Sequence, residues 1–282
     1  MNWNTKDLLR ACLHSIELFP PSTPFEVIVV DNASTDGSAE MVSTSFEWAI
    51  LVASKANTGY ARGNNLGFER AQGEYILTLN PDTEFLDNSL DIALKFLQDH
   101  PSVGCIGIKQ MGVDDMIQQS VRGFPTLLGI FGDVTGLGNS LGGHLDSYRL
   151  SRFNYHLEQP APQPMGTFLL FRRTALEAVG SAKAPFDESF PIFFNEVDLL
   201  YRLHKAKWNC VYTPTAQIRH HGGESTKQVR KSMIWESHKS LSRYLWKHYR
   251  ATARVLVLPF VSVLIFLTAF VRAKGYDAGY RA

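Results

Sequence analysis

Short β-branched runs alternate with helical segments through the first part of the chain, and this alternation constrains the fold most strongly. The runs that read as strands lie at 25–30, 48–53, 75–79 and 103–108, and the intervening helical patterns lie at 34–46, 60–71 and 89–98. Alternation of this kind predicts an α/β fold with βαβ units and a mostly parallel central sheet flanked by helices. Ligands of such sheets bind beyond the carboxyl ends of the strands, so the polar residues that follow each run are candidate site residues.

Residues 112–164 interrupt this alternation, because they are rich in Gly, Ser, Asp and Pro with scattered aromatic residues. We expect long loops with short helices there, able to order around a bound ligand. Regular patterns then return, with strands expected at 167–171, 208–213 and 216–220 and helices at 173–179, 196–206 and 228–249.

A continuously apolar segment at 255–271 is close to the minimum length for a membrane span and contains Pro259. Arginines at 250, 254 and 272 and a lysine at 274 flank it, which suits contact with an anionic leaflet. A buried helix of a soluble domain is the alternative, and it is less favoured because the run has no polar face. We therefore expect a membrane-associating segment that either lies on the bilayer or spans it.

The composition narrows the class of protein. A formal charge of +1 argues against a nucleic-acid partner, which usually leaves a basic footprint. Cys12, Cys105 and Cys210 are far apart, so neither a zinc site nor a disulfide framework is expected, and a reducing cytosolic setting fits. No signal-peptide pattern opens the sequence. We expect a nucleotide-binding domain at 1–226 and a helical region at 227–282.

Two polar clusters can contact a nucleotide. Asp31 and Asn32 follow the first strand pattern, where an acid and an amide can bond a pyrimidine base or a ribose hydroxyl. Helix capping by the residues that follow is the simpler explanation, and both can hold. Asn57, Gly59 and Arg62 mark a Gly- and Asn-rich helix entry that can face phosphate or ribose, although a plain loop-to-helix junction gives the same pattern.

Three further groups of residues can carry chemistry. Asp82 ends the third strand pattern, where a carboxylate can hold Mg²⁺ or Mn²⁺ against a nucleotide diphosphate, although Asn-Pro-Asp also forms ordinary turns. His220 and His221 follow the last strand pattern, and a neutral imidazole is a good ligand for such metals. Glu196 and Asp198 open a helix whose dipole favours acids, and a carboxylate there can act as a general base toward a sugar hydroxyl.

In this order the clusters resemble family 2 glycosyltransferases, and most closely the bacterial rhamnosyltransferase branch. The resemblance covers residues 2 to about 249, and Asn-Trp-Asn at 2–4, the stretch 30–38 and Asn-Pro-Asp-Thr at 80–83 are its most specific parts. It implies a GT-A fold, which is a Rossmann-like nucleotide-binding domain. It also implies a divalent metal cofactor, Mg²⁺ or Mn²⁺.

The resemblance assigns roles to individual positions. Asp31 and Asn32 match the base-binding positions, Asp82 the last acid of a DxD-type motif, and Glu196 the catalytic base. His220 matches a metal-ligating histidine, with His221 as its competitor. The acceptor side is matched by Met165, Gly166, Thr167, Asp198 and Trp208, and Asp198 also matches an acid that supports the base or the fold.

The sequence departs from the family pattern in three places. The earlier acid of the DxD-type motif is absent, and Asn80 or Glu84 stands nearby instead. Asn195 replaces the first acid of the Glu-Asp motif, and Glu196 replaces its aspartate. The hydrophobic strand that precedes Asn-Trp-Asn in the family is missing, so we expect unpaired hydrogen-bonding groups on its neighbours.

The sequence therefore predicts a metal-dependent inverting glycosyltransferase that moves a sugar, rhamnose being the one the resemblance implies, from a dTDP- or UDP-sugar to a lipid-linked glycan acceptor. It would act in cell-surface polysaccharide and cell wall synthesis at the cytoplasmic face of the inner membrane, as a monomer or an oligomer. A non-catalytic scaffold with a degenerate transferase fold is the alternative, favoured by the departures above. A nucleotidyltransferase is disfavoured because no Gly-rich basic phosphate loop follows the first strand.

Overall fold

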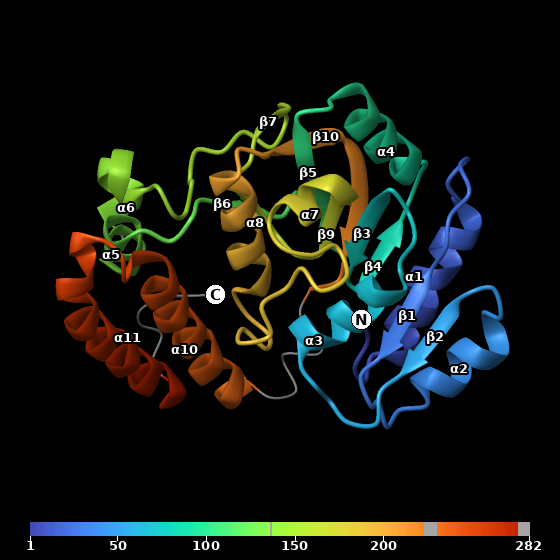
Figure 1. Cartoon of the computed structure of the whole chain (residues 1–282), viewed down its shortest axis with the longest axis horizontal. Coiled ribbons are helices and arrows are strands. Elements are labelled where there is room, and N and C mark those ends of the chain that lie inside the picture. The colour runs from blue at the N-terminus through green and yellow to red at the C-terminus, as the bar shows by residue number, and fades with distance from the viewer. Residues whose placement is uncertain (136, 223–229, 276–282) are drawn as a thin grey trace.

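The computed structural model describes residues 1–135, 137–222 and 230–275, which form two neighbouring sheets surrounded by helices (Figure 1). In the smaller sheet, β1 (Ile28–Asp31) pairs in parallel with β2 (Ile50–Ala53). Helices α1 (Lys6–Leu18) and α2 (Ser38–Ser45) cover it, because their buried apolar side chains pack against Val29 of β1. The strand expected at 25–30 thus begins later and ends on Asp31.

The larger sheet has the strand order β3, β9, β5, β10, β4, and β7 pairs with β10 at its side. Its strands are β3 (Tyr75–Leu79), β4 (Thr83–Phe85), β5 (Val103–Met111), β7 (Gln159–Pro160), β9 (Phe168–Arg172) and β10 (Asn209–His220). Only β5 and β10 pair in parallel, whereas β9 runs antiparallel to both β3 and β5. The expectation of a mostly parallel sheet is therefore wrong for this part. The reason is that β9 enters after the 112–164 excursion instead of through a crossover helix.

Helices cover the larger sheet much as the sequence predicts. They are α3 (Tyr60–Arg70), α4 (Ser89–Asp99), α7 (Arg173–Ala178) and α8 (Asn195–Lys205). The apolar face of α8 supplies Leu199, Leu200 and Leu203 to a core that includes Cys105 and Phe171 of the sheet. This packing anchors α8 along its length, so the first turn of the helix is held in a fixed place.

Two expectations about the second half of the chain are refined. The strands expected at 208–213 and 216–220 form one strand, β10, with a register shift between Thr213 and Gln217. The 112–164 segment contains the short helices that we expected, α5 (Leu127–Thr135), α6 (Leu137–Leu141) and η1 (Gly143–Leu145), with β6 (Val121–Arg122) and β8 (Gln163–Pro164) pairing beside them.

The first residues of the chain lie beside β1. Asn2 makes an isolated parallel bridge with Asp31, and its backbone bonds to Val30 and Asn32. A groove of about 440 Å³ lies between β1 and β3, lined mainly by apolar side chains. Among the described strands, β1 pairs with β2 and β3 pairs with β9, and Asn2 is the residue that bridges to β1 on its other side.

The described C-terminal part contains α10 (Arg230–Tyr249), η2 (Ala253–Val257) and α11 (Leu258–Ala273). Residues Ala253–Ala273 are long and apolar enough to cross a membrane, judged by length and composition, and 17% of the window tested is buried. The domain boundary that we expect between 226 and 227 lies outside the described residues.

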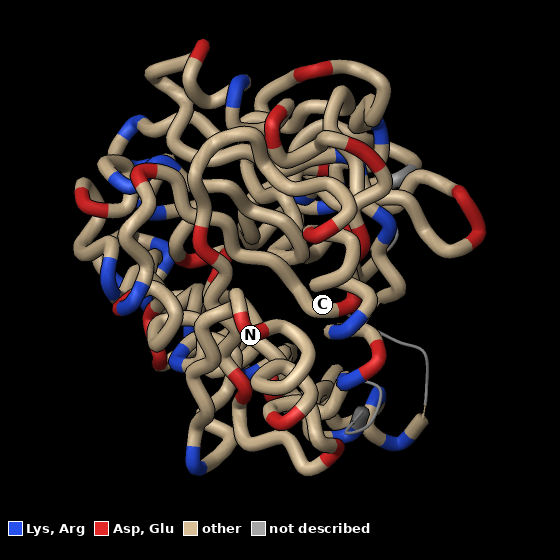
Figure 2. Tube along the Cα trace, turned by 90° about the vertical axis from the view of Figure 1, so that its right-hand side faces the viewer, with Lys and Arg blue, Asp and Glu red and all other residues tan. Residues whose placement is uncertain are grey.

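Figure 2 marks the positions of Lys and Arg and of Asp and Glu along the Cα trace, and the two kinds of position are interspersed on the side shown.

Candidate active site

Asp82 and His220 meet at one end of the larger sheet. Asp82 follows β3 in the turn to β4, and His220 ends β10, which pairs with β4 at this point. The Oδ2 atom of Asp82 lies 3.5 Å from Nε2 of His220, and both side chains are almost fully buried. Sheet pairing, and not sequence proximity, thus brings these two predicted ligands together.

Gln118 fixes the orientation of the His220 ring. Its Nε2 donates to the backbone oxygen of His220 at 3.0 Å, so its Oε1 must be the atom 2.7 Å from the ring Nδ1. Because Oε1 only accepts, Nδ1 carries a proton, and in the neutral ring the lone pair of Nε2 faces the Asp82 carboxylate. Two acceptor atoms facing each other fit a shared cation, so these residues suit a divalent metal.

His221, the competing candidate, takes a different partner. Its Nε2 lies 2.5 Å from Oε1 of Glu84, while its backbone N–H donates to the carbonyl of Asp82. Of the two histidines, His220 is therefore the one whose ring faces Asp82. Glu84, one of the two residues considered as a substitute for the missing acid, is occupied by His221.

Glu196 opens α8 and is only partly exposed. Burial raises the pKa of its carboxyl to about 7, and only a backbone hydrogen bond opposes this shift. Phe194, the residue before α8, adopts a left-handed backbone with φ of 67°, and Asn195 is fully buried with no hydrogen-bond partner for its side-chain amide. Strain and unsatisfied polar groups of this kind concentrate at functional sites.

Tyr60, at the start of α3, links the two halves of the site. Its hydroxyl donates to Oδ1 of Asn80 and lies 3.3 Å from the backbone oxygen of Gly166. Burial raises the pKa of Tyr60 well above its usual range, and the nearby charges of Glu196 and Asp82 raise it further. The Tyr60 hydroxyl thus contacts Asn80, which lies two residues before Asp82, and Gly166, whose backbone lies against the Glu196 side chain.

The acceptor-side segment 165–167 lies between Glu196 and Asn80. The position of a Cβ atom on Gly166 would lie 3.5 Å from Cγ of Glu196, so the backbone passes directly over the carboxylate-bearing side chain. Met165 and Glu196 line a small cavity of about 90 Å³, together with Arg122, Gln163 and Tyr148. Thr167 is buried and contributes its backbone oxygen to the N–H of Asn80.

Comparison with known proteins identifies the family. The sequence profile described as glycosyl transferase family 2 matches residues 2–180, which is more than half of the chain. The chain belongs to glycosyl transferase family 2.

Individual relatives agree with this assignment. An N-acetylglucosaminyl-diphospho-decaprenol L-rhamnosyltransferase of Mycobacterium tuberculosis is 30% identical over 234 residues, which cover 79% of this chain and 75% of the relative. An O-antigen biosynthesis protein of Myxococcus xanthus is 25% identical, covering 85% of this chain and 18% of that protein. The chain is thus a rhamnosyltransferase-like family 2 glycosyltransferase.

Among solved structures, a mannosyltransferase from Pyrobaculum calidifontis in complex with GDP-Man and Mn²⁺ superposes with a TM-score of 0.57 at 18% identity, covering 98% of this chain and 74% of that one. S. aureus TarS residues 1–349 superpose with a TM-score of 0.55 at 16% identity, covering 97% and 80%. These likenesses show the fold, which is the expected GT-A fold.

In this glycosyltransferase, most of the predicted nucleotide-binding residues form hydrogen bonds to each other or to neighbouring loop residues. Asn32 uses its whole amide, donating to Asn57 and to the backbone oxygen of Gly59 and accepting twice from Thr58. Asp31 accepts from the side chain of Asn2 and the backbone of Ser34. We therefore correct the expectation for Asn32, whose side chain has no bonding capacity left for a base, and Asp31 shapes the same turn.

The entry to α3 likewise has a structural role. Gly59 has φ of 87°, and a Cβ there would lie 2.7 Å from the carbonyl oxygen of Pro191. That oxygen also accepts the first two N–H groups of α3, so they are not free to bind phosphate. Arg62 forms an exposed ion pair with Glu188 at 3.0 Å, and it is the predicted phosphate contact that solvent can reach.

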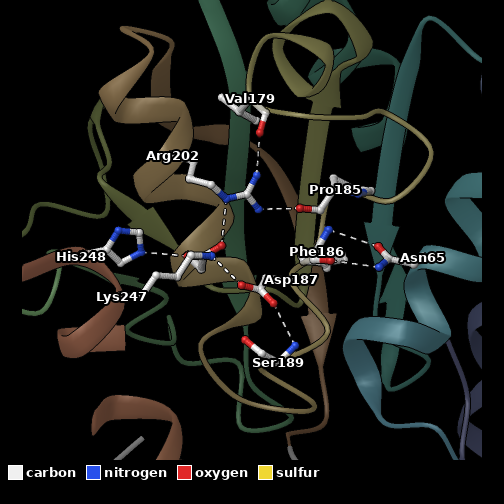
Figure 3. Close-up of polar contacts among 10 residues, drawn as sticks. Asn65, Val179, Pro185, Phe186, Asp187, Ser189, Arg202, Lys247 and His248 are labelled. Atoms are coloured by element: carbon white, nitrogen blue, oxygen red, sulfur yellow. Dashed lines mark hydrogen bonds and ion pairs between the residues drawn. The ribbon is translucent and has the colours of Figure 1, made fainter. Parts of the chain in front are cut away.

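Asp198 does not contact the acceptor side, and this prediction is wrong. The side chain is fully buried, and its carboxylate accepts from Arg202, Lys247 and His248 at 2.7 to 2.9 Å (Figure 3). Burial alone would raise its pKa, but the His248 bond and the charges of Arg202 and Lys247 lower it to about 2. Asp198 instead fixes α8 to α10, in agreement with the supporting role that the resemblance also implied.

Trp208 is also misplaced by the sequence prediction. It lies beyond the last turn of α8, at the opposite end from Glu196, and packs on the core beside Gly104 and Ala175. Sequence reasoning missed Tyr60, Gln118 and Arg122, because no local pattern distinguishes them. Only the folded chain brings them next to Asn80, His220 and Glu196, respectively.

Proposed function

We propose that this glycosyltransferase moves a sugar, specifically rhamnose, from a dTDP- or UDP-sugar to a lipid-linked glycan acceptor with inversion at the anomeric carbon. The observation that carries the proposal is the Asp82–His220 pair, together with the Tyr60 hydroxyl that contacts Asn80 on its side and Gly166 on the side of Glu196. The name of the mycobacterial relative supports both rhamnose and the lipid-linked acceptor.

A divalent metal, Mg²⁺ or Mn²⁺, would be held by Asp82 and His220. Among residues 1–135, 137–222 and 230–275, no group of three His, Cys, Asp or Glu side chains is arranged to hold an ion. When bound, such an ion would offset the negative charge that develops on the departing nucleoside diphosphate.

Glu196 is the proposed catalytic base. Its carboxylate accepts the proton of an acceptor hydroxyl while that oxygen forms a bond to the anomeric carbon and the bond to the diphosphate oxygen breaks. A pKa near 7 suits this role, since a base is most effective when its pKa lies close to the working pH. Attack from the face opposite the leaving group inverts the anomeric centre in one displacement.

The acceptor approaches from the side of Met165 and the small cavity next to Glu196. Arg122 and Gln163 in its wall offer donors to sugar hydroxyls or to the phosphates of a lipid diphosphate. The apolar C-terminal segment would keep this opening close to the cytoplasmic face of the membrane, where a lipid-linked acceptor resides.

A transfer assay tests the proposal. Purified protein with Mn²⁺ and dTDP-rhamnose should glycosylate N-acetylglucosaminyl-diphospho-polyprenol, and Glu196→Gln should lower kcat by about 10²- to 10⁴-fold. Glu17→Gln, which changes an exposed acid on α1, serves as the matched control and should keep full activity.

Two results would count against the mechanism. A product that retains the donor's anomeric configuration would exclude a single displacement, and full turnover in Glu196→Gln would remove Glu196 as the base. Absence of transfer and of donor hydrolysis with every nucleotide sugar would favour the non-catalytic scaffold.

A further inference from the structure

An unusually large share of the exposed apolar surface comes from two segments distant in sequence. Of the twenty-four exposed large apolar side chains in the described parts of the chain, fourteen lie on α5–α6 or between 256 and 271. Such a concentration marks an interaction surface, because soluble proteins scatter exposed apolar residues singly.

The two segments lie at the same end of the molecule. Ile130 of α5 packs in one buried cluster with Leu258 and Ile265 of α11, and the Tyr249 hydroxyl at the end of α10 donates to the backbone oxygen of Pro125. In Figure 1, α5, α6 and α11 form the end of the molecule opposite α1 and α2.

The outward faces of both segments are apolar. On α5, Leu128 and Phe131 are 59% and 53% exposed, whereas the single acid, Asp133, is turned inward to an ion pair with Arg149. On α11, Phe260 and Phe270 are 68% and 52% exposed. No charged side chain therefore interrupts the outward face of either helix.

The surroundings of this surface are basic. Residues 237–275 contain seven Lys or Arg residues and no Asp or Glu. Arg254 and Lys274, near the two ends of the apolar segment, lie over the rings of Tyr249 and Phe270. An apolar face bordered by cations complements an anionic lipid leaflet, which attracts basic residues near its surface.

The packing of α11 determines how it meets the bilayer. Its inner face is buried, and α10 runs antiparallel beside it, with Trp246 and Ser242 both bonded to Ser262. Since α10 carries Lys239 and Arg243 and packs on α8, a spanning α11 would draw charged residues to hydrocarbon depth, which is costly.

We infer that α5–α6 and α11 together form one bilayer-docking face, with α11 lying in the plane of an anionic leaflet. This face comprises Leu128, Phe131 and Leu141 on one segment and Leu256, Phe260 and Val263 on the other. The α5–α6 part of this face is a second membrane-contacting element, which the apolar run at 255–271 does not indicate. Docking through this face requires neither the sugar donor nor the acceptor.

Vesicle binding tests the contribution of each segment. Binding is measured by sedimentation with vesicles of phosphatidylcholine and phosphatidylglycerol in equal parts, and separately with pure phosphatidylcholine. The double substitutions Leu128→Ser with Phe131→Ser, and Phe260→Ser with Leu267→Ser, should each weaken binding to the anionic vesicles by about tenfold or more. Pure phosphatidylcholine should bind the wild type more weakly.

A matched control separates this effect from general loss of exposed apolar surface. Leu18→Ser with Leu157→Ser removes two side chains that are 73% and 58% exposed elsewhere on the molecule, and should leave binding unchanged. Thermal melts identify any variant that fails to fold. Wild-type binding by a folded α5 double variant would overturn the two-segment face.

Depth measurements test the orientation of α11. Cysteines placed singly at 256, 263 and 270 carry a fluorophore that brominated lipids quench according to depth, while the three native cysteines are buried. An in-plane helix predicts equal depth at all three positions. A spanning helix predicts a change across the about 21 Å that separates the outer pair, and that result would overturn the proposed orientation.

A second copy of the chain is the competing occupant of this face. Light scattering after gel filtration, without lipid, should show that the double substitutions do not change the oligomeric state. A dimer in the wild type that the substitutions dissociate would assign the face to self-association instead. Glycosyltransfer to a water-soluble acceptor would persist in either case, so a failure here would not touch the proposed catalytic function.

Discussion

Replacing Glu196 with glutamine should increase stability while it lowers kcat, and the gain in stability should depend on pH. The folded-state pKa of about 7 lies above the ordinary value of 4.5 because the carboxylate is desolvated. The folded state therefore binds this proton more tightly than the unfolded chain does, and wild-type stability falls as pH rises from about 4.5 through about 7. The difference between the two values corresponds to about 3 kcal/mol at most, since 1.36 kcal/mol accompanies each pKa unit.

Urea unfolding from about pH 5 to pH 8 measures this effect. The stability of Glu196→Gln relative to wild type should rise with pH, by up to about 3 kcal/mol near pH 8. The control is Glu17→Gln, because hydrogen bonds from His14 and Trp48 lower the pKa of Glu17 and its loss should not stabilise the protein. A relative stability of Glu196→Gln that does not change with pH would refute the raised pKa, and with it the reason for choosing this residue as the base.

The remaining predictions concern the scaffold around the site. Asp198→Asn removes the buried carboxylate charge that Arg202, Lys247 and His248 contact, while Lys247 keeps its ion pair with Asp187, so it should cost about 1–3 kcal/mol at neutral pH, and the wild-type advantage should shrink as pH falls from about 4 toward 2. Gly59→Ala should destabilise by more than about 1 kcal/mol, whereas Gly222→Ala, with a similar φ of 85° but no atom of the described residues within 4 Å of the added Cβ, should cost less; thermal melts compare the two. Adding a five-residue Val/Ile-rich segment before Met1 should fill the groove between β1 and β3 and raise Tm by about 4 °C or more, whereas a Gly/Ser segment of the same length should not. Equal Tm values for the two extensions would contradict the strand-sized fit of that groove.

Local sequence patterns were sufficient to predict the positions of most helices and strands of this fold. The run 75–79 predicted β3 with its observed bounds, and the helix patterns matched α3, α4 and α8 within a few residues. Strand direction was not predictable, because the pairing of β9 with β3 and β5 depends on a loop excursion that carries no pairing signal. The residues at strand ends did predict that Asp82 and His220 lie at one end of the larger sheet.

Those candidate site residues were predictable whose side chains can bind a metal and which stand next to the end of a strand. Asp82 and His220 meet because Asp82 directly precedes β4, and the antiparallel pairing of β4 with β10 brings Thr83 opposite His220. Asp198 was assigned wrongly because its partners on α10 lie about fifty residues away, and an acid in a first helical turn gives no sign of such partners. The hydrogen bonds of Asn32 were also not predictable from the sequence, since its amide bonds to Asn57 and Thr58 in a turn about 25 residues away.

Manganese binding in the presence of a nucleoside diphosphate tests the central claim most directly. Electron paramagnetic resonance counts free Mn²⁺ during titration of the protein with UDP or dTDP. The arrangement of Asp82 and His220 predicts one bound ion per chain in wild type and in Glu196→Gln, with Kd raised at least about tenfold in both Asp82→Asn and His220→Gln. An unchanged Kd in those two variants would contradict the claim that this pair forms the metal site of the enzyme.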